Sequence, residues 1–256
     1  MKKRIDILLV ELGFAESRSQ AQRLVMAGQV RVEDQVVPKP SMMVATEARV
    51  EVEAGPAYVS RGGEKLAAAL TAYPIHIENR ICADVGASTG GFTDCLLQHG
   101  AARVYAIDVG HGILHWSLRK DPRVVSMERT NARKLKNLPE LVSLVTIDAS
   151  FISLRLLLPV VQGWLADEAD VVALIKPQFE AGKEFVGKRG VVRDPAVHRR
   201  VLEHVFDNAV SLDLPPQGIL RSPILGPKGN AEFLMWCRRM GKKADATILD
   251  ALFRDN

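Results

Sequence analysis

The stretch ICADVGASTGGFTDCLL, residues 81–97, decides the fold of this chain. It runs from a short apolar segment through a glycine-rich turn into a second apolar segment with helical spacing. Glycines let the backbone approach a ligand closely, and the N-terminus of the following helix adds partial positive charge. Ser88 stands where G-x-G-x-x-G has its second glycine, and no G-K-[ST] follows. The stretch therefore predicts a strand–turn–helix unit that seats a nucleoside cofactor.

Short apolar runs recur after this turn and predict a sheet. Each run is followed by helical or loop sequence, and strands that alternate with helices form a mostly parallel sheet covered on both faces. The last two runs are joined by LGPKGN (225–230), which predicts an antiparallel final hairpin at the sheet edge. The predicted strands are 81–86, 102–108, 123–127, 144–148, 170–176, 217–224 and 231–239, and the predicted helices include 63–73, 195–210 and 246–253.

The beginning of the chain has a different order of elements, namely two helices followed by short strands. Helical spacing marks residues 5–12 and 17–28. Alternating residues at 30–37 predict a hairpin that turns at Glu33–Asp34, and a further strand follows at 48–53. This order predicts a small α+β domain.

A linker separates this small domain from the sheet. Residues 53–61 contain Gly55 and Pro56 and lack periodicity, as is typical of a connecting segment. We therefore expect a small domain at 1–58 and a large α/β domain at 62–256. A length of 256 residues is sufficient for both.

The composition is that of a soluble globular protein, with 47% hydrophobic and 25% charged residues. A net charge of +4 is compatible with a polyanionic partner without requiring one. Asp6 and Glu11 interrupt the apolar N-terminal run, and no stretch approaches about 18 uncharged apolar residues, so we expect no signal peptide and no membrane span. Three widely spaced cysteines predict reduced thiols, no metal site and a cytoplasmic location.

The turn's D-x-G-x-x-x-G-G pattern, from Asp84 to Gly91, resembles the first motif of S-adenosylmethionine-dependent methyltransferases. In those enzymes the turn faces the methionine part of the cofactor. The next strand ends at Asp108, where a carboxylate can accept both ribose hydroxyls, and Asn131 falls near the expected adenine position. The resemblance implies that S-adenosylmethionine binds to Asp84, Gly86, Ala87, Ser88, Gly90, Gly91, Phe92, Asp108, Val109, Asn131 and Asp148.

Two lysines and two carboxylates fall at predicted strand or helix ends: Lys65 in RGGEK, Asp148 in TIDAS, Lys176 in LIKPQFE and Glu232 in GNAEF. The carboxyl ends of parallel strands face the ligand crevice. Lys176 follows an apolar run, and as a neutral amine it can act as general base towards a ribose 2′-hydroxyl. Asp148 and Glu232 would orient the lysines, so that catalysis is mostly in-line positioning. Plain salt bridges at loop ends are the alternative.

These four residues resemble the K-D-K-E tetrad of RNA 2′-O-methyltransferases of the FtsJ type. Residues 3–52 resemble the small RNA-binding domain named after ribosomal protein S-four, most specifically from Ser17 to Val30. Together with the motifs DVGASTGGFTD, KPQFE and GPKGNAE, the tetrad and the N-terminal domain resemble the TlyA family of ribosomal RNA methyltransferases, which are also called haemolysins. The resemblance covers nearly the whole chain. It implies a Rossmann-like methyltransferase domain that methylates the 2′-hydroxyl of cytidine in ribosomal RNA.

Basic residues outside the tetrad mark a candidate RNA-binding surface. Residues 1–31 carry six Lys and Arg side chains, which on one face would contact phosphates, although each alone could be solvated surface. The polar loop at 180–194 can clamp RNA phosphates and order on binding. Phe179 can stack on a flipped-out base or belong to the core. Contacts to ribosomal RNA or ribosomal subunits are predicted for Lys3, Arg4, Arg18, Arg23, Arg31, Arg61, Lys188 and Arg189.

Two other functions stay open at this point. A non-catalytic RNA-binding or ribosome-assembly factor would use the cofactor fold only as a platform. A membrane-active haemolysin would need an amphipathic or membrane-spanning segment, and the sequence shows none.

Overall fold

The computed structural model describes residues 1–53, 55–242 and 245–253. The chain divides into two compact units, Met1–Ala57 and Tyr58–Asn256. The boundary falls inside the segment that the sequence predicts as a linker. The second half of that segment is packed, because Tyr58 and Val59 contact the apolar core of the second unit and the Val59 N–H donates to Asp94 Oδ2 at 2.8 Å.

The first unit is built on two short helices, as predicted. α1 (Ile5–Glu11) and α2 (Arg18–Met26) share an apolar core with the strands that follow. The Ser17 hydroxyl accepts a hydrogen bond from the Gln20 backbone N–H at 3.3 Å and caps α2. The core residues shared by the helices and strands include Ile5, Leu9, Ala21, Val25 and Val30.

The predicted hairpin is present in this unit. β2 (Val30–Val32) pairs antiparallel with β3 (Gln35–Val36), and β5 (Val50–Val52) pairs with the other edge of β2. Glu33 and Asp34 have φ values of 49° and 63°, the left-handed conformation that a two-residue hairpin turn needs. A second pair of strands was not predicted, because three-residue strands carry too little periodicity. These strands are β1 (Lys2–Arg4) and β4 (Met43–Ala45).

The second unit holds a seven-stranded sheet in the order β11-β12-β10-β9-β6-β7-β8. The strands from β10 to β8 pair in parallel, and β12 pairs antiparallel with both of its neighbours. This arrangement confirms the predicted sheet and its antiparallel last strand. The strands are β6 (Ile81–Val85), β7 (Arg103–Ile107), β8 (Val124–Met127), β9 (Val142–Ile147), β10 (Leu165–Ile175), β11 (Pro216–Arg221) and β12 (Phe233–Arg238).

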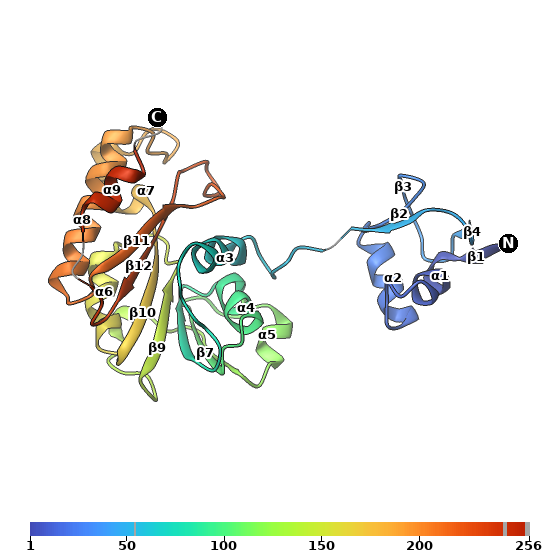
Figure 1. The fold of residues 1–256 in the computed structure, drawn as a ribbon, viewed down its shortest axis with the longest axis horizontal. Helices are drawn as coiled ribbons and strands as arrows, with labels where there is room; N and C mark the ends of the chain where they lie inside the picture. The colour runs from blue at the N-terminus through green and yellow to red at the C-terminus, as the bar shows by residue number, and fades with distance from the viewer. Residues whose placement is uncertain (54, 243–244, 254–256) are drawn as a thin grey trace. The chain divides into compact units, whose positions relative to one another are not determined.

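Helices cover both faces of the sheet (Figure 1). On one face lie α3 (Gly62–Ala72), α4 (Gly91–Gln98) and α5 (Trp116–Lys120). On the other face lie α6 (Leu154–Gln162), α8 (Pro195–Ser211) and α9 (Thr247–Ala251). The two apolar clusters meet opposite sides of the strands, so the sheet is buried on both faces. Shorter turns are α7 (Pro177–Glu180), η1 (Ala132–Lys134) and η2 (Lys183–Phe185).

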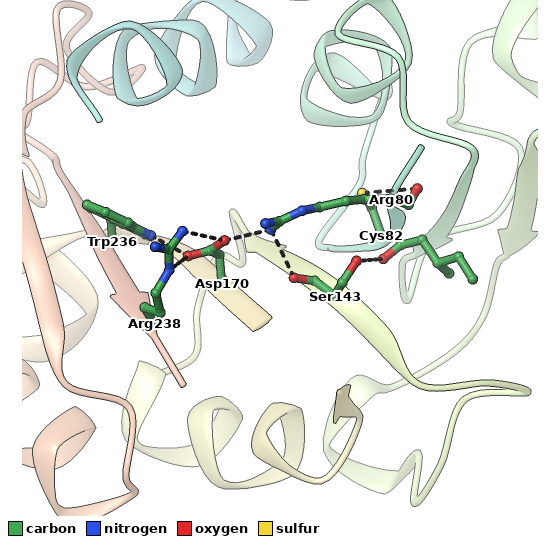
Figure 2. Close-up of polar contacts among 7 residues, drawn as sticks. Arg80, Cys82, Ser143, Asp170, Trp236 and Arg238 are labelled. Atoms are coloured by element: carbon green, nitrogen blue, oxygen red, sulfur yellow. Dashed lines mark hydrogen bonds and ion pairs between the residues drawn. The ribbon is translucent and has the colours of Figure 1, made fainter. Parts of the chain in front are cut away.

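A buried carboxylate holds together the end of the sheet that lies away from the strands' carboxyl ends. Asp170 on β10 is 1% exposed and accepts hydrogen bonds from Arg80 Nη1 at 2.6 Å, Trp236 Nε1 at 2.8 Å and Arg238 Nε at 2.9 Å (Figure 2). Burial raises the pKa of Asp170, but the hydrogen bonds from Arg238, Arg80 and Trp236 outweigh it, so the pKa is lowered overall.

Replacing Asp170 with Asn should lower the free energy of unfolding by about 2 kcal/mol at neutral pH, because it removes the buried charge that two half-buried guanidinium groups bind. The pKa of Asp170 is lowered in the folded state. Its contribution is therefore complete above the unfolded pKa of about 3.9 and is lost as the pH falls through the folded pKa. We expect the two proteins to converge in stability below about pH 4, as measured by urea unfolding.

Asp167→Asn is the matched control, since Asp167 lies exposed on the same strand. It should change the free energy of unfolding by less than about 0.5 kcal/mol. Equal losses in the two variants would contradict the role given to Asp170.

Candidate active site

The second unit contains a cavity of about 630 Å³ at the carboxyl ends of β6, β9 and β10. Its wall includes the glycine-rich turn, the start of α3 and the segment that joins β11 to β12. The four residues that the sequence singled out as catalytic all line it: Lys65, Asp148, Lys176 and Glu232.

One pair of opposite charges in the wall joins the start of α3 to the start of β12. Lys65 Nζ lies 2.6 Å from Glu232 Oε2, and the two side chains are 10% and 1% exposed. Gln178 Nε2 approaches the other carboxylate oxygen of Glu232 at 3.4 Å. Gly226 makes room for this carboxylate, because a Cβ at that position would lie 2.4 Å from Glu232 Oε1. The local sequence thus leaves space for a buried carboxylate that a lysine neutralises.

The second pair lies at the ends of two neighbouring parallel strands. Lys176 Nζ lies 2.6 Å from Asp148 Oδ1 and donates hydrogen bonds to Ser150 Oγ at 3.0 Å and to the Asp148 carbonyl at 3.4 Å. The contact with Oδ1 is close enough for charge attraction, but it is not aligned as a hydrogen bond. Among the described residues, this buried oxygen has no hydrogen-bond donor. Asp148 lines the cavity with its side chain 22% exposed, so its carboxylate group remains accessible to a bound molecule.

The glycine-rich turn is shaped by close backbone contacts. Gly86 has φ +83°, and a Cβ there would lie 2.8 Å from the Asp148 carbonyl oxygen. Gly90 has φ +98° and would place a Cβ 2.2 Å from Leu118 Cδ1. Ser88 adopts φ 51° without being glycine, in the part of the turn that lines the cavity. Gly86 therefore lets the turn pass against the end of β9, and Gly90 lets the start of α4 pack against Leu118, so the two glycines fix the path of the turn that lines the cavity.

Comparison with known proteins assigns the chain. Residues 58–239 match the model of the FtsJ-like methyltransferase family, and residues 3–50 match that of the S4 domain. The chain belongs to the FtsJ-like methyltransferase family. The predicted fold class and enzyme class are therefore confirmed.

Relatives of this FtsJ-like protein match along most of its length. It is 47% identical, over 95% of this chain and 92% of the relative, to the 16S/23S rRNA (cytidine-2′-O)-methyltransferase TlyA of Mycobacterium tuberculosis. It is 42% identical, over 90% of this chain and 98% of the relative, to Hemolysin A of Brachyspira hyodysenteriae. A solved structure of a provisionally named hemolysin from Streptococcus thermophilus superposes with a TM-score of 0.73 at 42% identity, covering 97% and 94% of the two chains.

Asp84, at the end of β6 in this FtsJ-like domain, lies beneath the turn. It is fully buried and accepts hydrogen bonds from Thr93 Oγ1 at 2.7 Å and from Thr146 Oγ1 at 3.2 Å. It does not line the cavity, so its direct contact with a cofactor stays a prediction. Its carboxyl group ties β6 to α4 and β9, and this bonding fixes the turn from below.

Four further predicted cofactor residues lie outside the cavity wall, and one of them, Gly90, packs against Leu118. Asp108, at the tip of β7, accepts hydrogen bonds from the Ser88 N–H at 2.8 Å and the Gly110 N–H at 2.7 Å. Val109 is 71% exposed, and Asn131 Oδ1 accepts from the Arg133 N–H at the start of η1. The hydrogen bond between Ser88 and Asp108 joins the end of β7 to the glycine-rich turn. Their contacts with adenosine stay predictions.

The predicted RNA-binding residues of the first unit are mostly paired with acids. Arg4 and Arg18 both bind the buried carboxylate of Asp6 at 2.9 Å, and these bonds, that of Arg4 first, hold its pKa well below the usual range. Lys3 pairs with Glu11 at 2.8 Å, Arg31 pairs with Glu53 at 2.5 Å, and Arg23 donates to Ser19 Oγ.

The basic residues predicted in the second unit are placed differently. Arg61 lines the cavity, and Lys188 and Arg189 lie exposed on the loop after α7. Over the described parts of the chain, none of the three forms an ion pair. The free positive charge thus lies close to the cavity.

Sequence reasoning missed seven polar or aromatic residues of the wall, among them Thr89 and Lys228. Phe151 is the most unusual, because it is 89% exposed, has φ 64°, and its ring centroid lies 5.0 Å from that of Phe179. Its position next to the TIDAS motif was the only available signal. The others are Ser60, Ser150, Gln178 and Asn230, each within a few residues of a motif.

No helix in the described ranges is long and apolar enough to cross a membrane. The three cysteines are free and buried, as expected.

Burial raises the pKa of Asp84 to about 7. The unfolded carboxyl ionises near pH ~3.9, so between these values the folded protein binds a proton that the unfolded chain has lost. The free energy of unfolding should therefore decrease as the pH rises from about 4 to about 7. Asp84→Asn removes this dependence, and we expect its thermal stability to gain on that of wild type across the same range. Parallel pH profiles would contradict the assignment.

Proposed function

We propose that this protein transfers a methyl group from S-adenosylmethionine to the ribose 2′-hydroxyl of a cytidine in ribosomal RNA, in the cytoplasm. The observation that carries the proposal is the cavity in which Lys65–Glu232 and Lys176–Asp148 meet beside the glycine-rich turn. Support comes from an FtsJ-like domain and from 47% identity to a relative named as an rRNA (cytidine-2′-O)-methyltransferase.

The residues present fit the cofactor. Gly86 lets the turn pass close to the Asp148 carbonyl, Gly91 lines the cavity without a side chain, and the Asp148 carboxylate offers an acceptor in the wall. When bound, S-adenosylmethionine supplies an electrophilic methyl group for the ribose oxygen. Helix α4 begins at Gly91, and the N–H groups of its first turn carry partial positive charge. This charge favours the carboxylate group of S-adenosylmethionine.

Lys176 and Asp148 are suited to hold the target hydroxyl. The observed pair changes the predicted division of roles, in which Lys176 is the general base: the Lys176 ammonium, fixed by Ser150, can donate to the 2′-oxygen, while the Asp148 carboxylate can accept the hydroxyl proton. Charge pairing keeps this arrangement neutral before substrate arrives. The Lys65–Glu232 pair fixes the opposite wall. Catalysis then comes mainly from in-line positioning, with proton transfer to a neighbouring carboxylate.

The rim of the cavity is suited to RNA. Arg61 and Lys228 line it, and the exposed ring of Phe151 stands at its mouth beside Phe179. A phenylalanine with positive φ is strained, and strain of this kind gathers at ligand sites. We infer that the Phe151–Phe179 pair stacks on the base of a nucleotide whose ribose enters the cavity.

Lys176→Ala should lower methyl transfer at least about 100-fold, while RNA binding is retained, because the lysine acts on the reacting oxygen. The assay follows labelled methyl groups from S-adenosylmethionine into ribosomal subunits and maps the site by resistance to alkaline cleavage. Lys134→Ala, an exposed lysine in η1, serves as the control. Unchanged methylation by Lys176→Ala would leave the assembly-factor alternative standing.

Phe151→Gly should reduce kcat/KM for RNA about 10- to 100-fold, because a stacked base contributes about 1–3 kcal/mol. The same variant should be more stable by about 0.5–1 kcal/mol, since glycine relieves the positive φ and the ring is almost fully exposed. Activity and urea unfolding measured on one preparation check both outcomes. A variant that loses stability, or that keeps full activity, would contradict this role.

A further inference from the structure

Asn230 connects two segments that are distant in sequence and adjacent at the cavity. Its side chain is buried, and both ends of its amide are used. Nδ2 donates to the Gly190 carbonyl at 2.9 Å, and Oδ1 accepts from the Val192 N–H at 3.0 Å. The residue stands two positions before Glu232, on the approach to β12. A single amide therefore joins the loop after α7 to the strand that carries a residue of the tetrad.

The loop that Asn230 holds is folded. The Gly187 N–H donates to the Val191 carbonyl at 3.1 Å, and the Gly190 N–H donates to the Gly187 carbonyl at 2.8 Å. His198 Nε2 lies 3.0 Å from the Val192 carbonyl. The guanidinium group of Arg200 also stacks on Phe185 of this loop, with Cζ 3.9 Å from the centre of the ring. The sequence had suggested a loop that orders only on binding, whereas the loop has its own anchors before any RNA is present.

The loop presents positive charge beside the cavity. Lys188 and Arg189 are exposed and, within the ranges that the structure describes, make no ion pair. Their neighbour Gly190 lines the cavity, as does Asn230 itself. Lys228 approaches from the other segment, with Nζ 3.5 Å from the site of a Cβ on Gly190. Unpaired cations in a fixed arrangement fit the phosphodiester backbone of RNA.

The segment between the loop and the tetrad is also rigid. The Gly226 N–H donates to the Asn230 carbonyl at 2.9 Å, and the Gly229 N–H donates to the Gly226 carbonyl at 2.8 Å. Gly226 lies against the Glu232 carboxylate, where a Cβ would be 2.4 Å from Oε1. A displacement of the loop would therefore be transmitted through one short turn to Glu232.

We infer that Asn230 is a positioning residue that sets the distance between a phosphate-binding loop and the tetrad. The inference rests on the function proposed above and deepens it. Lys188 and Arg189 bind the backbone next to the target nucleotide, and the amide of Asn230 fixes them so that the target ribose reaches Lys176 and Asp148. Because the two cations bind the substrate backbone, a loop held in place strengthens the binding of RNA at the cavity, and its release weakens that binding.

The test is a double-mutant cycle between Asn230→Asp and the pair Lys188→Ala/Arg189→Ala. Asp keeps an acceptor for the Val192 N–H and replaces the donor to the Gly190 carbonyl with a second acceptor, which releases the loop. With ribosomal subunits as substrate, we expect Asn230→Asp to raise KM for RNA about 10-fold. The dissociation constant for S-adenosylmethionine should not change. The penalty of removing Lys188 and Arg189 should shrink to less than about 2-fold in the Asn230→Asp background.

Multiplicative effects in the cycle would overturn the inference, as would a loss of kcat with KM unchanged, since either result would separate Asn230 from the phosphate contacts. Methylation by the wild-type chain in the same assay tests the proposed function by itself, so the two failures are distinguishable. If Asn230→Asp does not fold, His198→Ala replaces it in the cycle, because it removes another anchor of the same loop. A coupled rise in KM is expected there too, and an uncoupled one overturns the inference.

Discussion

The contact between the first turns of α3 and α4 decides the position of Lys65, the first residue of the predicted tetrad. A Cβ on Gly91 would lie 2.8 Å from the Gly63 backbone nitrogen and 2.3 Å from Ser60 Oγ, so the two backbones meet without side chains between them. Lys65 follows within the same turn and reaches Glu232 across 167 positions of sequence. Gly91, at the start of α4, therefore lets α3 approach the glycine-rich turn, and this approach sets the reach of Lys65. In α3 itself, Gly63 makes room for Tyr58, because a Cβ there would lie 2.2 Å from Tyr58 Cγ.

Two carboxylates on the same sheet show how the protein separates stability from chemistry. Asp170 receives hydrogen bonds from three donors and is enclosed, so its charge is fully used in holding strands together. Asp148, at the opposite end of the parallel strands, lies beside Lys176 but keeps Oδ1 without a hydrogen-bond donor from the described residues. Buried charge costs free energy in both places, and pairing offsets it. Only at Asp148 is an acceptor left for substrate.

The sequence predicted those features that depend on local signals. Strand ends followed by polar residues identified Asp148 and Lys176, because the carboxyl ends of parallel strands must meet at one edge. The positive φ values at Glu33 and Asp34 bear out the hairpin turn. Asn230 and the Asp6–Arg18 pair could not be found in this way, since both depend on partners that only the folded chain brings near. Helices and strands can be recognised from the periodic spacing of apolar residues, whereas hydrogen bonds between residues distant in sequence cannot be read from spacing.

The basic residues of the first unit are mostly paired with acids, but these pairs do not neutralise all of their positive charge. Asp6 is fully buried and binds Arg4 and Arg18, whose side chains remain 36% and 53% exposed. One carboxylate thus holds two guanidinium groups, which leaves a local excess of positive charge. Each guanidinium group also has N–H groups beyond those that donate to Asp6. Side chains already held in place lose less entropy when they meet a phosphate. Within the proposed function, Asp6 therefore holds these two arginines in place for the predicted contact with RNA and does not cancel their charge.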